Sequence, residues 1–245
     1  AAFMPMVRGD VDPATGLNLR GDELLVKARE AMLNAVQSFN NPRAQFKSET
    51  FIVVAVIAFT YLLHWHYRRQ SIDIRQKRTV DGAEQVLRTR HGAEKLWELE
   101  TCLDHAACPL DEPTIANLKF LIAIRHEIEH QMTRRIDDAI SAKLQACCLN
   151  FNRAVREIAG AEHGLEGELG LALQFTTIDR DQRKILLAET DLPANVQAAQ
   201  IEFEDALTDQ MIADPRYSYR VAYVEQSVNS RGKADQVVEF IRSDT

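Results

Sequence analysis

The segment from Thr50 to Tyr67 reads Thr-Phe-Ile-Val-Val-Ala-Val-Ile-Ala-Phe-Thr-Tyr-Leu-Leu-His-Trp-His-Tyr and contains no formally charged side chain. The apolar run, interrupted by one threonine and one tyrosine, ends at Leu63, and His64 and His66 make the remainder more polar. A helix that spans a membrane needs about 20 mostly apolar residues. We therefore expect a helix from about Ser48 to Arg69 that is buried at the centre of an all-α bundle, where neighbouring helices cover every side.

Segments with helical spacing of apolar residues flank this helix on both sides. One runs from Asp22 to Phe39 and stops before Asn40-Asn41-Pro42, because a proline disfavours helix in the residue before it. Asp111-Glu112-Pro113 is typical of a helix start, with acidic residues and proline in the first turn. Further helices are expected over Asp137–Ile158 and Pro193–Ile212, and shorter ones over Asp81–Arg88 and Ala93–Leu103.

The composition agrees with a helical protein. Of 245 residues, 46% are hydrophobic and 27% are charged, which excludes wholesale disorder. Only 10 glycines and 7 prolines occur, and a many-stranded sandwich or barrel needs more turn-forming residues than that. The 29 basic and 36 acidic residues give a net charge of -7, which argues against a protein that coats duplex nucleic acid. The 4 cysteines are too few for a disulfide scaffold, so we expect a cytoplasmic protein. We also expect no membrane span, because the apolar run that ends at Leu63 is short for one.

The tail has a different pattern. Tyr217, Tyr219, Val221 and Tyr223 alternate with other residues, and a period of two predicts a strand. Residues Gly232 to Arg242 read as a helix. Alternating tyrosine and arginine can stack on and neutralise nucleic acid, but tyrosine is also an ordinary strand residue.

Together these patterns predict a mainly α protein with a small C-terminal α/β appendage. Gly9, Pro13 and Gly16 indicate a flexible arm at the start of the chain. A lone strand needs a partner, which lies elsewhere in the chain, in another copy or beyond Thr245, and we expect the native protein to continue past this end. The predicted parts are the arm over residues 1–21, a helical domain over 22–190 and a helix-strand-helix appendage over 191–245.

The most informative segment for function is Leu121 to His130. It contains His126-Glu127-x-x-His130, in which two histidines four residues apart share a helix face and can hold zinc, with Glu127 as general base. Glu129 lies inside this motif, where zinc proteases usually carry an uncharged residue, and the following residues supply neither a glycine turn nor a third histidine. A zinc hydrolase is therefore an alternative and not the leading interpretation.

The same segment holds a second motif, Arg125-x-x-x-x-His130. Arg125 falls on the apolar stripe of its predicted helix, and a buried guanidinium is costly unless it is paired. Glu129, four residues later, can pair with it. One interpretation is therefore a structural ion pair that the histidines merely flank.

This motif, with a polar residue directly after the arginine and an apolar helix before it, resembles the signature of the HEPN superfamily. Two further blocks, Ala31–Phe51 and Gln145–Asn152, look like those of an uncharacterised bacterial domain family assigned to that superfamily. The resemblance covers roughly Asp22 to Asp244. One departure is His126, because the superfamily commonly has Asn or Asp there.

The resemblance implies an all-α HEPN-like bundle that acts as a homodimeric, metal-independent endoribonuclease without a cofactor, in a bacterial toxin–antitoxin or phage-defence setting. Arg125 and His130 are then the expected catalytic residues. His126 and Glu49 are second-tier candidates for orienting His130 or positioning the ribose. The alternative within the same fold is a non-catalytic scaffold that dimerises and binds nucleic acid or a partner protein such as an antitoxin.

The chemistry suits these residue types. Histidine can take the proton of a 2′-hydroxyl or protonate a leaving 5′-oxygen near neutral pH, and a guanidinium can hold a phosphate through two hydrogen bonds. Five residues advance a straight helix by about 500°, so Arg125 and His130 diverge by about 140° around its axis. Two antiparallel copies of the chain, or a distorted helix start, can bring these groups together, and the nuclease hypothesis expects the homodimer.

Overall fold

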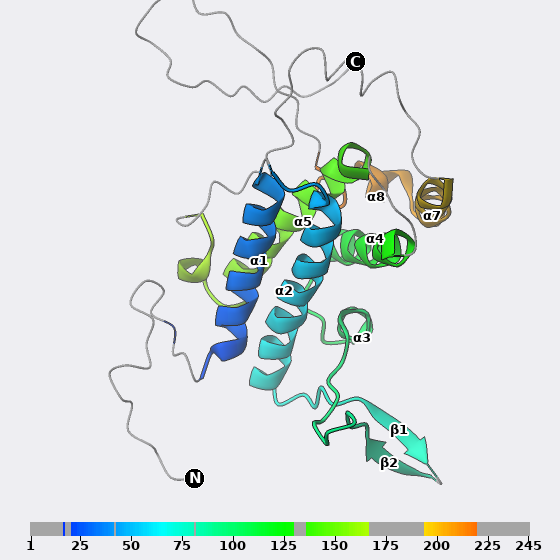
Figure 1. Cartoon of the computed structure of the whole chain (residues 1–245). Helices are drawn as coiled ribbons and strands as arrows, with labels where there is room; N and C mark the ends of the chain where they lie inside the picture. Colours follow the sequence, from blue (N-terminus) through cyan, green and yellow to red (C-terminus); the bar gives the residue numbers. More distant parts are fainter. Residues whose placement is uncertain are drawn as a thin grey trace, which may run out of the picture.

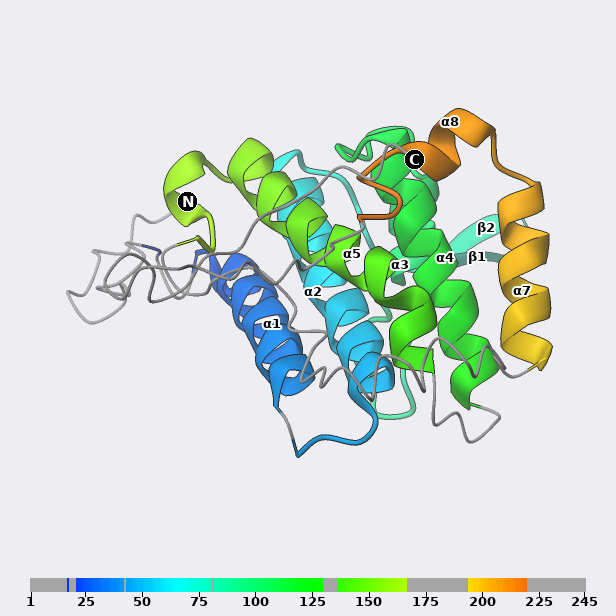
Figure 2. The same cartoon turned by 90° about the horizontal axis from the view of Figure 1, so that it is seen from above.

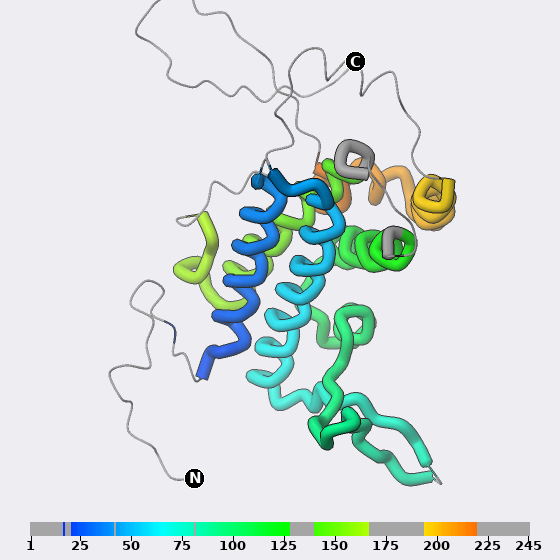
Figure 3. The backbone as a smooth tube through the Cα atoms, in the orientation of Figure 1, coloured from blue at the N-terminus to red at the C-terminus, as the bar shows by residue number. Residues whose placement is uncertain are grey.

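The computed structural model describes residues 17, 21–41, 43–80, 82–129, 136–166 and 194–219, with the side chains of 128–129 and 136–139 left out. The described chain is a helical bundle with one two-stranded sheet (Figures 1 and 3). This confirms the mainly α fold class. The longer helices are α1 (Glu23–Asn40), α2 (Lys47–Arg69), α4 (Glu112–Glu129), α5 (Ile136–Ile158) and α7 (Ala194–Asp205). The short elements are β1 (Lys77–Val80), β2 (Ala83–Val86), α3 (Leu99–Asp104), η1 (Ala161–His163) and α8 (Asp209–Ala213).

Helix α2 is the centre of the bundle, as its sequence predicts. It forms a helical hairpin with α1 and also packs against α3, α4 and α5 (Figures 1 and 2). Within the described residues it is the one helix long and apolar enough to cross a membrane, with a mean hydropathy of 1.5 over 18 residues. However, 56% of that stretch is buried inside the protein. Burial against neighbouring helices explains why the segment is apolar on most sides.

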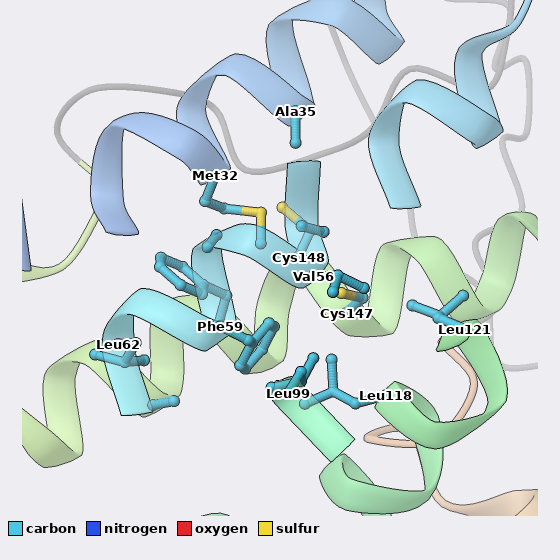
Figure 4. Packing of buried hydrophobic residues seen from close by; sticks show 14 of the residues in the cluster. Met32, Ala35, Val56, Phe59, Leu62, Leu99, Leu118, Leu121, Cys147 and Cys148 are labelled. Carbon is cyan, nitrogen blue, oxygen red and sulfur yellow. The ribbon is translucent and has the colours of Figure 1, made fainter. Parts of the chain in front are cut away.

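The core forms where α2 crosses α5 (Figure 4). Phe59 of α2 and Phe151 of α5 are fully buried, and their ring centroids lie 5.1 Å apart in an edge-to-face arrangement, which is a favoured geometry for aromatic pairs. Cys147 and Cys148 are buried beside them, and all four cysteines are free thiols. Burial raises the pKa of Cys148 to about 12, so this thiol is a core side chain and not a nucleophile.

The predicted helix over 81–88 is wrong, because this segment belongs to a β-hairpin. Strands β1 and β2 pair antiparallel, with Lys77 opposite Val86 and Val80 opposite Ala83. Gly82 in the connection has a φ of +78°, a conformation that glycine adopts without strain. The predicted helix over 93–103 is also partly wrong, since only α3 is helical and the residues before it form isolated bridges with the hairpin.

The C-terminal region differs in detail from its prediction. The helix expected over 193–212 is divided into α7 and α8, and Thr208 Oγ1 caps α8 by accepting a hydrogen bond from Met211 N at 3.2 Å. Tyr217, the first residue of the predicted strand, lies in a turn and is fully buried. The rest of that strand from residue 220 onward and the helix expected over 232–242 lie outside the described residues, as does most of the predicted arm.

Buried His64 makes the stability of the bundle dependent on pH. Its Nε2 lies 2.9 Å from the carbonyl oxygen of Trp97, and its pKa is lowered by burial. The unfolded chain therefore takes up a proton near pH 6.5, before the folded chain does. The contribution of neutral His64 to the free energy of unfolding is therefore present above this pH and is lost as the pH falls. We expect the urea midpoint to decrease between about pH 7 and pH 5, and to decrease less in His64→Gln. Parallel pH profiles for the two proteins would contradict this assignment.

Candidate functional site

The last turns of α4 carry Arg125, His126 and Glu127 of the predicted motif, and these side chains are partly or fully exposed to solvent. Residues 116–121 are almost all buried, and Ile124 is fully buried one turn further on. Arg125 is half-buried, with its Nε shielded from solvent, and His126 is exposed. The core side of α4 thus holds the helix in place, while Arg125 and His126 lie at its boundary with solvent.

The next residue, Glu127, is held by α7. Asn195 Nδ2, in the first turn of α7, donates to the carbonyl oxygen of Glu127 at 3.4 Å and to its Oε2 at 3.3 Å. Phe203 of α7 stacks edge-to-face on Phe120 of α4, with ring centroids 5.6 Å apart. Helix α7 therefore runs along α4, and its N-terminal end lies beside the motif.

The first turn of α2 and the end of α4 lie at the same edge of the bundle, next to the start of α5 (Figure 2). We call this the motif edge: the first turn of α2 with Glu49, and residues 125–127 of α4. Glu49 is half-buried there. The structure thus brings together the elements that carry Glu49, Arg125 and His126, although they are far apart in the chain. His130 and the side chain of Glu129 lie outside the described residues.

A polar network that sequence reasoning did not identify holds the C-terminal segment to α4 and α5. Buried Asn117 donates through Nδ2 to the carbonyl oxygens of Lys143 at 3.0 Å and Tyr217 at 2.8 Å. Asn150 donates through Nδ2 to the carbonyl oxygen of Arg216 at 2.6 Å. Buried amides satisfy main-chain acceptors that would otherwise be costly to bury. The sequence signal for this network was the presence of two polar residues, Asn117 and Asn150, among the apolar residues of predicted helices.

A buried ion pair fixes α7 to α5. Lys143 Nζ lies 2.7 Å from Glu204 Oε1, and it also lies 4.8 Å from the ring centroid of Phe120 and 5.3 Å from that of Tyr217. Burial, with Glu204 nearby, raises the pKa of the Tyr217 hydroxyl. Beside these groups is a cavity of about 170 Å³, lined by Ala142, Lys143, Gln200, Glu204, Ile212, Tyr217 and Ser218. We interpret this cluster as a structural contact that holds α7 against α5, because its two charges already neutralise each other.

Comparison with known protein families gave a match that covers most of the chain. The family model described as domain of unknown function (DUF3644) matches residues 23–207. The chain belongs to the DUF3644 family. This match begins with α1 and ends just after α7, so the DUF3644 domain includes the motif edge and the ion pair that holds α7. No curated protein and no solved structure matches the chain.

The zinc alternative gains no support from the described part of this DUF3644 domain. No group of three or more His, Cys, Asp or Glu side chains gathers in the described ranges, and Glu127 of the zinc motif is engaged by Asn195. A catalytic zinc normally has three protein ligands. Within the described residues, His126 therefore has no such set around it.

Proposed function

We propose that this DUF3644 protein is a HEPN-like, metal-independent endoribonuclease in which Arg125 and His130 carry the chemistry. The observation that supports this most is the position of Arg125, which is half-buried near the end of α4, directly before exposed His126. A guanidinium offers two parallel donors that match the oxygens of a phosphate. A bacterial toxin–antitoxin or phage-defence role in the cytoplasm belongs to the same proposal.

The reaction needs only these two residue types. His130 takes the proton from a ribose 2′-hydroxyl, and the 2′-oxygen forms a bond to phosphorus as the bond to the 5′-oxygen breaks. The 5′-oxygen receives a proton from a protonated histidine, which leaves a 2′,3′-cyclic phosphate and a 5′-hydroxyl end. Arg125 stabilises the charge that builds on the non-bridging oxygens. Glu49 and His126 orient His130 or hold the ribose.

Two copies of the chain complete the site in this proposal, because Arg125 and His130 diverge by about 140° on a straight helix. Exposed apolar side chains on α2 support an association surface. Val53 is 38% and Ile57 41% exposed, one helical turn apart, and Phe46, just before the helix, is 50% exposed. A protein that remains monomeric at all concentrations by light scattering would contradict a composite site.

The second candidate is a non-catalytic HEPN-like scaffold that binds nucleic acid or a partner protein such as an antitoxin. The same exposed side chains of α2 favour it, since they can pack against a different protein. His126, at the position where the superfamily commonly has Asn or Asp, also fits a copy without activity. Both candidates share the fold and differ in whether RNA is cut.

The decisive test is incubation of the full chain with labelled single-stranded RNA in EDTA. We expect cleavage by the wild type, and a loss of about 10²–10⁴-fold in His130→Ala, the range for a general acid or base. His91→Ala, in an exposed turn after β2, is the matched control and should keep full activity at a saturating RNA concentration. Cleavage that survives His130→Ala would identify a contaminant. No cleavage of varied RNAs would favour the scaffold, and activity that only zinc restores would favour the hydrolase.

A further inference from the structure

The hairpin region is a basic area in an acidic protein. Residues 70–95, which follow α2, contain six Lys and Arg but four Asp and Glu, whereas the whole chain contains 29 and 36. Charges of one sign that gather in one place create a local potential that the average charge conceals. The net charge of -7 therefore does not describe the field around this part of the molecule.

One face of the hairpin neutralises its own cations. Residues two apart on a strand, and residues directly paired across strands, share a face. On this face each basic side chain has an acidic neighbour. The ion pairs are Arg75–Asp73 at 2.8 Å, Lys77–Glu84 at 3.1 Å and Arg88–Glu94 at 3.0 Å.

The opposite face carries cations without such neighbours. Arg78 pairs across the strands with Gln85, so alternation places it on the face opposite to Lys77. Lys95 bonds through its backbone to Gln76 and Leu87, and this register places it on the face of Arg78. Both side chains are exposed, and neither forms an ion pair with any residue in the described part of the chain. We call Arg78, Lys95 and the amides of Gln76 and Gln85 the open face.

Packing does not explain why this hairpin extends from the bundle. Its base is anchored by buried Ile74, whose carbonyl oxygen accepts a hydrogen bond from Trp97 N at 2.8 Å. Beyond that anchor, three of the four residues in each strand are exposed, and the hairpin projects past the end of α2 (Figure 1). A two-stranded hairpin that buries so little apolar surface contributes almost nothing to a hydrophobic core.

We propose that the hairpin is an RNA-binding arm whose open face contacts phosphate groups. The choice of RNA rests on the proposed function, and the contact itself rests on charge complementarity, because Lys and Arg without acidic partners are the side chains that neutralise phosphates. The hairpin and the motif edge lie at opposite ends of α2, whose 23 residues span about 34 Å. The arm therefore adds affinity for longer RNA and takes no part in the chemistry.

Two double variants with equal charge change test the arm. Arg78→Gln/Lys95→Gln alters the open face, and Lys77→Gln/Arg88→Gln alters the ion-paired face of the same hairpin. The probe is a labelled 2′-O-methyl RNA of about 30 nucleotides, which has no free 2′-hydroxyl and stays intact. At about 0.15 M salt we expect the open-face variant to bind about tenfold more weakly, with the slope of log affinity against log salt reduced by about 1.4. The control variant should change affinity less than about threefold.

The outcomes separate this proposal from the proposed nuclease. An equal loss of RNA affinity in both variants, or no loss in either, overturns the proposal that the hairpin is an RNA-binding arm. Circular dichroism and melting temperatures show whether both variants are folded. Arg125-dependent cleavage, without any effect of the open-face variant on binding, would reject the RNA-binding arm and keep the nuclease. An open-face effect on binding in a protein that cuts no RNA would keep the arm and remove the nuclease.

Discussion

Arg125→Ala is expected to lower the rate of RNA cleavage by about 10²–10³-fold, the cost of removing one preorganised donor to a developing negative charge. Arg125 lies near the end of α4 and is half-buried. Arg125→Lys should recover only part of the rate, because an ammonium keeps the charge but not the two parallel donors. The measurement is the initial rate of cleavage of single-stranded RNA in EDTA, at equal protein concentration.

The matched control for Arg125 is Lys119→Ala on the same helix. Lys119 is 38% exposed and pairs with Asp104 on the surface, so its loss removes one positive charge from α4 outside the motif edge. We expect an unchanged rate, since exposed ion pairs contribute little to stability. Equal losses in Arg125→Ala and Lys119→Ala would show that general charge, and not the motif, determines the rate.

Phe59→Ala is expected to destabilise the protein by about 3–5 kcal/mol, the range for removing a buried aromatic ring. Phe59 is fully buried and packs edge-to-face on Phe151, which joins α2 to α5. That loss is a large part of the total stability of a typical domain, about 5–15 kcal/mol. Urea unfolding followed by circular dichroism gives the free energy of unfolding for wild type and variant.

Val53→Ala is the control for the core position, because Val53 lies on the same helix and is 38% exposed. At a protein concentration low enough to keep the chain monomeric, we expect a change below about 1 kcal/mol at this surface position. Similar losses at Val53 and Phe59 in the monomer would contradict the assignment of only the Phe59 side of α2 to the core.

The long helices could be predicted because their sequences repeat one signal over many turns. The apolar run that forms α2 and the acidic-proline start of α4 both gave the right element in the right place. The hairpin was missed because its strands have four residues each and are mostly exposed, which leaves no apolar alternation to read. Asp81-Gly82 was the usable signal, since this dipeptide is typical of tight hairpin turns.

The candidate site was predictable only in part. The motif and the resemblance indicated Arg125, His126 and Glu49 as candidates, but no sequence pattern predicted that Asn195 of α7 donates hydrogen bonds to Glu127. The residues that hold α7 and the C-terminal segment act across long separations, as Asn117 does with Tyr217 and Lys143 with Glu204. Such pairs follow from packing in three dimensions, and each partner alone looks like an ordinary polar residue on a helix.

The ends of the RNA products test the central claim most directly. Mass spectrometry of RNA incubated with wild-type protein in EDTA should detect 2′,3′-cyclic phosphate and 5′-hydroxyl ends, and these should be absent with His130→Ala. A 2′-deoxy substitution at the cut position should block that cut. Products with 3′-hydroxyl and 5′-phosphate ends, or cyclic phosphates that persist in His130→Ala, would contradict cleavage through the 2′-hydroxyl by this histidine.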